Sequence, residues 1–226
     1  MISSVEGNGA IPTDTGVSFR VWAPDVDAVS VAGSFNDWAP ESNFLSHEGN
    51  GFWSALISTA RVGHNYKFVI HEGGSQVMKN DPYARDVITS AGNSVIVDPS
   101  FDWSGDNFVI ANWNELVIYE LHVGTFNDDL DPGLGTFRSI KARLPILRDL
   151  GINALLIMPA AEFPGDFSWG YNPAHPFAIE DVFGTPRNFQ DFVLTAHQHG
   201  MAVIMDVVYN HFGPNDLDLW RFTSWN

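Results

Sequence analysis

Hydrophobic and polar residues alternate over short distances in the first hundred positions of the chain. Val17, Phe19 and Val21 alternate with residues that can face water, which is the period-two pattern of a strand with one face in a core. Two further runs of β-branched and aromatic residues cover positions 52–57 and 66–70, and glycine-containing turn signals bound them. Short strands at this spacing predict a small β-sandwich.

The pattern changes after residues 99–114, which are rich in Asp, Ser, Gly, Asn and Trp and have no periodicity. We interpret this stretch as a linker between a first domain, residues 1–98, and a second domain, residues 115–226. Residues 116–123 then form a nearly continuous apolar run, which is typical of a parallel strand covered on both faces.

Apolar residues next recur at spacings of three and four, from Phe137 to Leu147, which predicts a helix. Thr136 is its candidate N-cap and Gly151 its C-terminal stop, and Pro145 inside it is expected to kink it. The chain continues with a strand at 153–158, a long loop to about residue 185, a helix at about 186–199 and a strand at 202–208. This β-α-β-α-β order predicts parallel strands, either in an open doubly wound sheet or in a (β/α)8 barrel.

The composition narrows the class of partner. The chain has 226 residues, 45% of them hydrophobic, and a formal net charge of −16, which disfavours nucleic acid and anionic membrane surfaces. It has no cysteine, no signal-peptide pattern at its start and no apolar run of the ~18 residues that a membrane span requires. The prediction is a soluble cytoplasmic protein with a neutral partner.

Two segments carry candidate chemistry. Asp206 follows an apolar strand, where a polar side chain would project into the mouth of an α/β fold, and Asn210 and His211 come directly after it. Trp169 and Tyr171 lie in the long loop, and their flat rings could stack on sugars. The alternative for the two rings is that they pack the loop against the domain, and the loop by itself does not decide between these readings.

Four motifs together resemble the first three barrel strands of the α-amylase superfamily, in the family's order. They are Ile-Tyr-Glu-Leu-His-Val-Gly-Thr-Phe from residue 118, Leu-Gly-Ile-Asn-Ala-Leu-Leu-Ile-Met-Pro from 150, Trp-Gly-Tyr from 169 and Asp-Val-Val-Tyr-Asn-His from 206. The wording is most similar to glycogen-branching enzymes and maltooligosyltrehalose trehalohydrolases. The resemblance implies an N-terminal immunoglobulin-like sandwich followed by about three β/α units of a (β/α)8 barrel.

The resemblance also implies roles for the candidate residues. Tyr171 would stack against the glucose whose bond is cleaved, with Trp169 beside it, and His211 would hydrogen-bond the primary hydroxyl of that glucose. Asp206 would orient groups that arrive from a later strand. Asn210 matches a position that is a calcium ligand in some relatives and structural in others, and we predict no metal and no cofactor.

The first domain resembles the starch- and glycogen-binding modules that precede the barrel in such enzymes. Positions that bind sugar in some of these modules match Trp38, Lys67 and Asn93. A second tryptophan of those modules is replaced here by the segment 72–76, Glu-Gly-Gly-Ser-Gln. A structural role and a sugar site therefore both stay open for this domain.

The implied function is cleavage or transfer of α-1,4-glucosidic bonds by a retaining mechanism, on an α-glucan or maltooligosaccharide. The family's catalytic carboxylates are borne on its fourth, fifth and seventh strands, and the sequence around Asp216 and Asp218 does not match them. We therefore expect this chain to be inactive by itself and to be a fragment or a truncated gene product. A non-catalytic glycan-binding protein and a decayed remnant are the alternatives, and hydrolysis versus transfer stays open.

Overall fold

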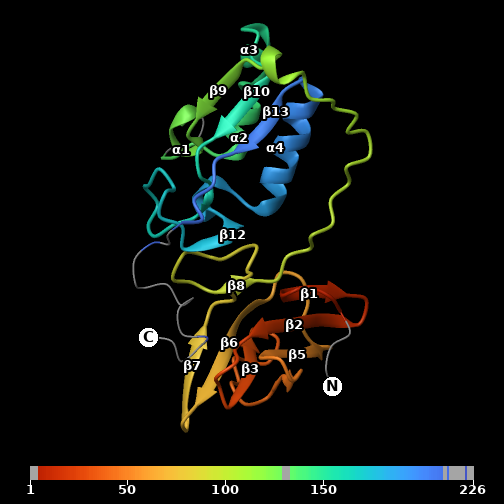
Figure 1. Cartoon of the computed structure of the whole chain (residues 1–226), viewed down its shortest axis with the longest axis vertical. Coiled ribbons are helices and arrows are strands. Elements are labelled where there is room, and N and C mark those ends of the chain that lie inside the picture. The colour runs from red at the N-terminus through yellow and green to blue at the C-terminus, as the bar shows by residue number, and fades with distance from the viewer. Residues whose placement is uncertain (1–4, 129–132, 211–212, 214–221, 223–226) are drawn as a thin grey trace. The chain divides into compact units, whose positions relative to one another are not determined.

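The computed structural model describes residues 5–128, 133–210, 213 and 222. The chain divides into two compact units, Met1–Pro99 with Pro214–Asn226, and Ser100–Gly213. Figure 1 shows the first unit as strands and the second as strands with helices. Each unit is built around its own hydrophobic core.

The first unit contains two antiparallel sheets. One sheet has the order β1-β2-β5-β4, and the other has the order β3-β6-β7 with β8 paired to β6. The strands are β1 (Gly9–Thr13), β2 (Gly16–Trp22), β3 (Ala28–Gly33), β4 (Ser46–His47), β5 (Phe52–Ile57), β6 (Asn65–Glu72), β7 (Ser75–Lys79) and β8 (Ser94–Val95).

The core between the sheets comes from alternate residues of their central strands. Val17, Phe19 and Val21 of β2 are almost completely buried, as their alternation predicts, and β6 contributes Tyr66 and Phe68 from the other sheet. The Phe19 ring contacts the Tyr66 ring edge-on, with centroids 5.1 Å apart. Period-two burial on both sheets confirms the predicted sandwich.

Strand β7 extends the sandwich where the sequence shows only a turn. Gly73 and Gly74 both have positive φ angles, 57° and 78°, and form the two-residue loop of a β6–β7 hairpin. Such loops match the twist of the paired strands and favour glycine. The segment that replaces the second tryptophan of sugar-binding modules is therefore a hairpin end.

The second unit contains a parallel sheet of order β13-β10-β9. Its strands are β9 (Ile118–Leu121), β10 (Ala154–Ile157) and β13 (Ala202–Met205). The other elements are η1 (Trp113–Glu115), α1 (Val123–Phe126), α2 (Phe137–Lys141), α3 (Leu144–Asp149), β11 (Ala161–Glu162), β12 (His175–Ile179), η2 (Asp181–Phe183) and α4 (Pro186–Gln198). The predicted parallel pairing is confirmed, and the long loop contains an antiparallel hairpin, β11–β12, that the sequence did not predict.

The helix predicted from Thr136 to Gly151 is two helices. Thr136 caps α2 through a reciprocal pair of hydrogen bonds with Ser139, as an N-cap should. Pro145 lies in the first turn of α3, where its missing N–H has no intrahelical partner to lose. The prediction of a kink was wrong because the proline starts a new helix after a break at residues 142–143.

Both long crossovers pack on the same face of the parallel sheet. Phe137 of α2 and Phe192 of α4 lie with ring centroids 5.4 Å apart, and both belong to the core that contains Leu155 and Ile157 of β10. An open doubly wound sheet would be covered on both faces. Strands in sequence order with helices on one side are the arrangement of a barrel wall, which is the fold that the resemblance implies.

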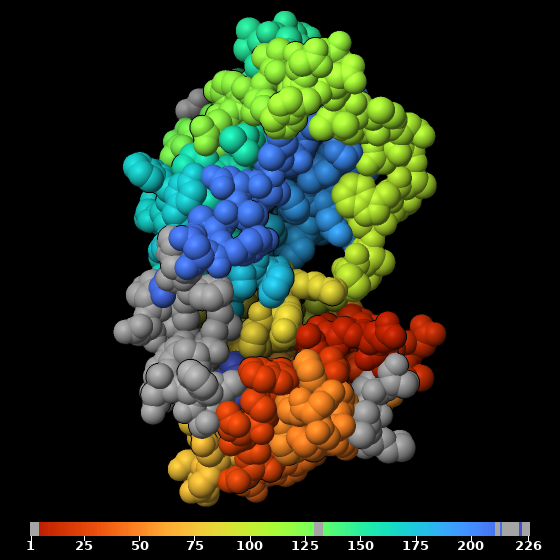
Figure 2. Space-filling model, in the orientation of Figure 1, coloured from red at the N-terminus to blue at the C-terminus, as the bar shows by residue number. Residues whose placement is uncertain are grey.

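The segment before β9 packs on α4. Asp106 accepts a hydrogen bond from His197 Nδ1 at 2.8 Å, and the Phe108 ring stacks on the His197 ring with centroids 4.5 Å apart. Arg187 donates to the Ser100 carbonyl at 2.8 Å. Figure 2 shows part of this segment, in yellow-green, against the blue surface of α4. Residues 100–114, which are most of the predicted linker, thus belong to the second unit and contact its helix α4. Within the described residues no helix has the length and apolarity to cross a membrane.

Candidate functional site

Polar side chains follow the two outer strands of the parallel sheet, and a methionine follows the central one. His122 comes directly after β9, Met158 after β10 and Asp206 after β13. The ladder continues one step past β10 and β13, because Met158 N donates to the Leu121 carbonyl at 3.0 Å and Asp206 N to the Ile157 carbonyl at 2.9 Å. Parallel strands end at one edge of the sheet, so these three residues lie at a common rim.

A short hydrogen bond joins Asp206 at the rim to the long loop. Tyr171 Oη donates to Asp206 Oδ2 at 2.6 Å, across 35 positions of sequence. This hydrogen bond to a carboxylate raises the pKa of Tyr171, and partial burial and the charges of Asp206 and Glu120 raise it further. The structure therefore brings together Tyr171 and Asp206, two of the residues that the sequence singled out.

Aromatic rings project from this loop into solvent. Phe167 is 83% exposed, Trp169 73% and Tyr171 38%. Gly170 between them has a φ of 84°, and a Cβ there would lie 2.0 Å from the Pro159 carbonyl oxygen. The loop backbone thus lies directly on the end of β10, and only glycine fits at that point of contact.

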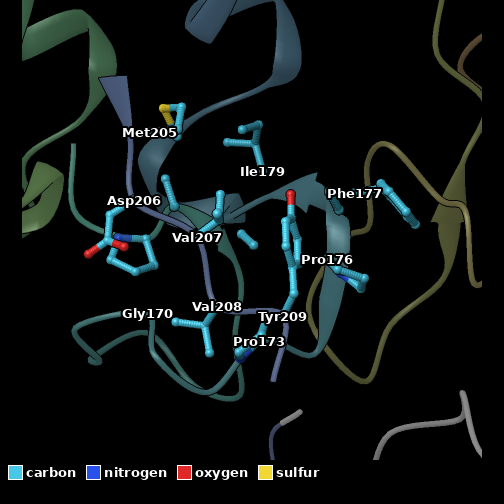
Figure 3. A pocket seen from close by; sticks show the side chains of 14 residues that line it. Gly170, Pro173, Pro176, Phe177, Ile179, Met205, Asp206, Val207, Val208 and Tyr209 are labelled. Carbon is cyan, nitrogen blue, oxygen red and sulfur yellow. The ribbon is translucent and has the colours of Figure 1, made fainter. Parts of the chain in front are cut away.

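Two hollows flank this contact. One is an open cleft of about 760 Å³ whose lining includes His122, Met158 and Trp169. The other is a smaller, mostly apolar cavity of about 230 Å³ between β12 and residues 205–209. Figure 3 shows the Asp206 carboxyl group pointing away from the Tyr209 ring that lines the smaller cavity. Asp206 is one of the residues that line this cavity, and its carboxylate accepts the hydrogen bond of Tyr171.

Two buried glutamates hold the hairpin under the loop. Glu180 Oε2 accepts from Phe163 N at 3.0 Å, and Glu162 Oε2 accepts from Asp181 N at 2.9 Å. Burial raises the pKa of Glu180 to about 7, against the two backbone hydrogen bonds that lower it. Because its carboxyl group is occupied by backbone donors, we interpret Glu180 as a structural residue of the hairpin.

The remaining residues of this predicted group lie beyond β13. Asn210 is exposed, and His211 lies outside the described residues. No cluster of three or more His, Asp or Glu side chains suited to a metal ion occurs in the described parts of the chain. Asn210 accordingly has no set of described carboxylate or imidazole ligands beside it.

The sandwich candidates lie in or next to elements of the β3-β6-β7 sheet, to which β8 is paired. Tyr66 of β6 pairs with Ser94 of β8, and Lys67 and Asn93 are the next residue on each side of this pair. Trp38 follows β3 in a loop, and its φ of 58° is left-handed, which is uncommon for a residue with a side chain. Asn36 fixes this loop, since its side chain accepts from Gly33 N at 2.9 Å and donates to Asn43 Oδ1 at 2.7 Å.

Sequence reasoning missed two residues at the rim. His122 lines the open cleft, and Glu120 of β9 contributes to the raised pKa of Tyr171. Both belong to the Tyr-Glu-Leu-His motif that ends β9. Their position at the carboxyl end of a parallel strand was the signal that could have identified them.

Comparisons with known proteins agree with the fold of the two units. Residues 8–84 match the family described as Carbohydrate-binding module 48 (Isoamylase N-terminal domain), and residues 120–218 match Alpha amylase, catalytic domain. A malto-oligosyltrehalose trehalohydrolase of Saccharolobus solfataricus is 35% identical over 89% of this chain and 34% of its own length. A 1,4-alpha-glucan branching enzyme of Thiobacillus denitrificans is 35% identical over 93% of this chain and 30% of its own length.

A solved structure is also similar. A crystal structure of a Salmonella typhimurium protein described as an alpha amylase superposes with a TM-score of 0.84, at 31% identity, over 97% of this chain and 36% of that one. The chain spans about a third of the length of the relatives that it matches. In family terms, the chain joins a carbohydrate-binding module 48 to the first part of an α-amylase-family catalytic domain.

Proposed function

We propose that the Tyr171–Asp206 rim binds an α-1,4-glucan as part of an enzyme that cleaves or transfers α-1,4-glucosidic bonds with retention. The observation that carries this proposal is the 2.6 Å hydrogen bond that ties the aromatic loop to the carboxyl end of β13. This hydrogen bond places an aromatic ring beside a carboxylate. The ring can stack on a sugar face, and the carboxylate can accept hydrogen bonds from the sugar hydroxyl groups. The names of the similar proteins, a branching enzyme and a trehalohydrolase, supply the substrate class.

The charges at the rim suit a neutral ligand with many hydroxyl groups. The negative charges of Asp206 and Glu120 both raise the pKa of Tyr171, and Asp166 lines the open cleft. Carboxylates accept hydrogen bonds and repel anions, so the rim would favour a sugar over a phosphate or a nucleic acid. Trp169, on the wall of the same cleft, offers a second exposed ring for a neighbouring glucose.

We assign Asp206 to orientation rather than to nucleophilic attack. A retaining mechanism uses a nucleophilic carboxylate and a carboxylic acid about 5 Å apart, on either side of the bond that breaks. The Asp206 carboxylate already accepts the Tyr171 hydroxyl, which lowers its nucleophilicity and fixes its direction. The chain by itself is then expected to bind glucan without turning it over, and transfer and hydrolysis both remain open for the whole enzyme.

Titration with maltoheptaose tests the proposed site. Y171A removes the ring and is expected to weaken affinity about tenfold or more, whereas Y171F keeps the ring and should lose less. Isothermal titration calorimetry measures the affinities, and chromatography of the sugar checks for cleavage. Unchanged affinity in Y171A would remove this rim as the glucan site, and cleavage by the chain alone would contradict the assigned role of Asp206.

A second glucan site on the sandwich has its own support. Asp37 and Trp38 have φ angles of 52° and 58°, and two successive left-handed residues cost on the order of 2 kcal/mol together. Such strain is retained mainly where a loop has a function. The loop follows β3, which pairs with the strand that bears Lys67, and Trp38 N donates to the carbonyl of Gly33 at the end of β3. W38A should then weaken binding, while W22A, which truncates an exposed ring on the other sheet, should not.

The non-catalytic alternative would show in the same titration. If only W38A weakens affinity, the sandwich is the glucan-binding element and the rim has no ligand of this class. If neither substitution changes affinity, glucan binds at neither of the two proposed sites. If the unsubstituted chain binds no maltoheptaose, a glycan-binding role is lost and a decayed remnant is the remaining hypothesis.

A further inference from the structure

His122 makes a hydrogen bond to the backbone of the aromatic loop from the opposite side of the rim. Its Nε2 lies 2.9 Å from the Ser168 carbonyl oxygen, and its Nδ1 lies 3.2 Å from Thr125 Oγ1. A carbonyl oxygen can only accept, so Nε2 carries a proton and donates it. In the neutral ring Nδ1 then accepts from the Thr125 hydroxyl, and both ring nitrogens are engaged.

Ser168 transmits this contact to the rest of the loop. Its hydroxyl lies 2.5 Å from Asn172 Oδ1, to which it donates, and it accepts from Gly170 N at 3.1 Å. Ser168, Gly170 and Asn172 are the less exposed members of a segment in which every second residue is aromatic. Anchoring these three residues therefore turns Phe167, Trp169 and Tyr171 outward.

The surroundings of His122 fix its ring. The ring lies edge-on to Phe183, with centroids 5.5 Å apart. A Cβ at Gly124 would lie 3.1 Å from His122 Cε1 and 3.0 Å from Phe183 Cε1, so the glycine leaves the space that the two rings need. The position of His122 is thus set by packing as well as by hydrogen bonds.

We propose that His122 is a positioning residue, which holds the loop Asp166–Asn172 so that the Tyr171 hydroxyl reaches Asp206. Phe167 and Trp169 are mostly in solvent, and packing of their own side chains cannot set the loop. The loop is instead fixed through Ser168 by His122, and through Gly170 by its close contact with Pro159. This role deepens the proposed function, because it explains how the rings of the glucan site are presented.

The test uses the spectroscopic signature of the Tyr171–Asp206 hydrogen bond in the full 226-residue chain. Tyrosine labelled with 13C at Cζ gives one resonance per ring, and Y171F assigns that of Tyr171. H122F keeps a ring of similar size but cannot donate, so Tyr171 should titrate at lower pH than in the unsubstituted chain. H122Q, whose Nε2 can donate to the Ser168 carbonyl, should restore the titration.

Two further measurements separate the outcomes. The amide spectra of α4 and of the sandwich should be unchanged in H122F, which excludes global unfolding. Maltoheptaose affinity should fall about tenfold in H122F and recover in H122Q. An unaltered Tyr171 titration in H122F overturns the positioning role. If the titration responds but the unsubstituted chain binds no maltoheptaose, the proposed function fails while the positioning role stands.

Discussion

At the scale of single residues, one buried carboxylate couples the folding of the sandwich to the binding of a proton. Asp81 is completely buried, accepts from the Tyr66 hydroxyl at 2.5 Å and accepts from Tyr83 N at 2.8 Å. Burial raises the pKa of Asp81 to about 6, although the Tyr66 hydrogen bond lowers it. The folded sandwich therefore binds a proton that the unfolded chain has already released near pH 4.

This proton makes the stability of the sandwich depend on pH. The contribution of Asp81 is fully present below about pH 4 and is lost as the pH rises through 6, a change of about 3 kcal/mol at most. We expect D81N to abolish this part of the decline in the free energy of unfolding, measured by urea titration at pH 4, 5 and 6. Y66F removes a hydrogen bond to the charged form, and should move the loss to higher pH. Equal slopes in D81N and the unsubstituted chain would contradict the assignment.

Two glycines of the site loop form a matched pair. Gly165 and Gly170 both have left-handed φ angles, 77° and 84°, but a Cβ at Gly165 would meet open space, whereas one at Gly170 would lie 2.0 Å from a backbone oxygen. G165A should cost only the strain of the left-handed region, about 1 kcal/mol. G170A should displace the loop as well and cost about 2 kcal/mol more.

The Tyr171 hydroxyl reports the displacement. In G170A the hydrogen bond to Asp206 should be lost, so that the Tyr171 ring titrates at lower pH, while G165A should titrate as the unsubstituted chain does. Urea unfolding gives the two stabilities. Equal behaviour of the two variants in both measurements would show that the loop does not depend on its contact with Pro159.

At the scale of elements, the sequence predicts the strands and helices that have a strong apolar pattern. Strand β5 has the predicted bounds, and α4 differs from its prediction by one residue at its end. Strand β1 was missed because it has a single large apolar residue and a proline, and β7 was missed because it is short, mostly exposed and has no alternating apolar pattern. The break between α2 and α3 was hidden because the apolar spacing continues across it.

For the candidate site too, local sequence pattern predicts the separate parts but not the contacts between them. The strand ends that bear Asp206 and the loop that bears Tyr171 follow from local pattern and from the resemblance. Their hydrogen bond joins residues 35 positions apart, and the loop that connects them contains a hairpin with weak local signal. His122 was missed because a single histidine after a strand has no spacing pattern. Its role depends on a backbone carbonyl 46 positions away.

At the scale of the whole molecule, two features oppose each other. The net charge of −16 keeps copies of the chain apart at low ionic strength. Strand β9, in contrast, is an edge of the parallel sheet, and among the described residues no strand pairs with its other side. Val117, just before β9, is 50% exposed, and Ile118 and Tyr119 within it are 44% and 37% exposed. An exposed apolar edge strand can pair with another chain.

Raising the salt concentration should show whether charge repulsion or the apolar β9 edge controls self-association. The Debye length shortens from about 10 Å at 0.1 M to about 3 Å at 1 M, so salt removes the repulsion between copies but not the attraction between apolar edges. We expect self-association to rise with NaCl in sedimentation velocity experiments. I118K places a charge on the edge and should reduce it, whereas V62K, at a 49% exposed position of the sandwich, adds the same charge elsewhere and should reduce it less. Equal association of the two variants would show that net charge rather than the β9 edge controls contact between copies.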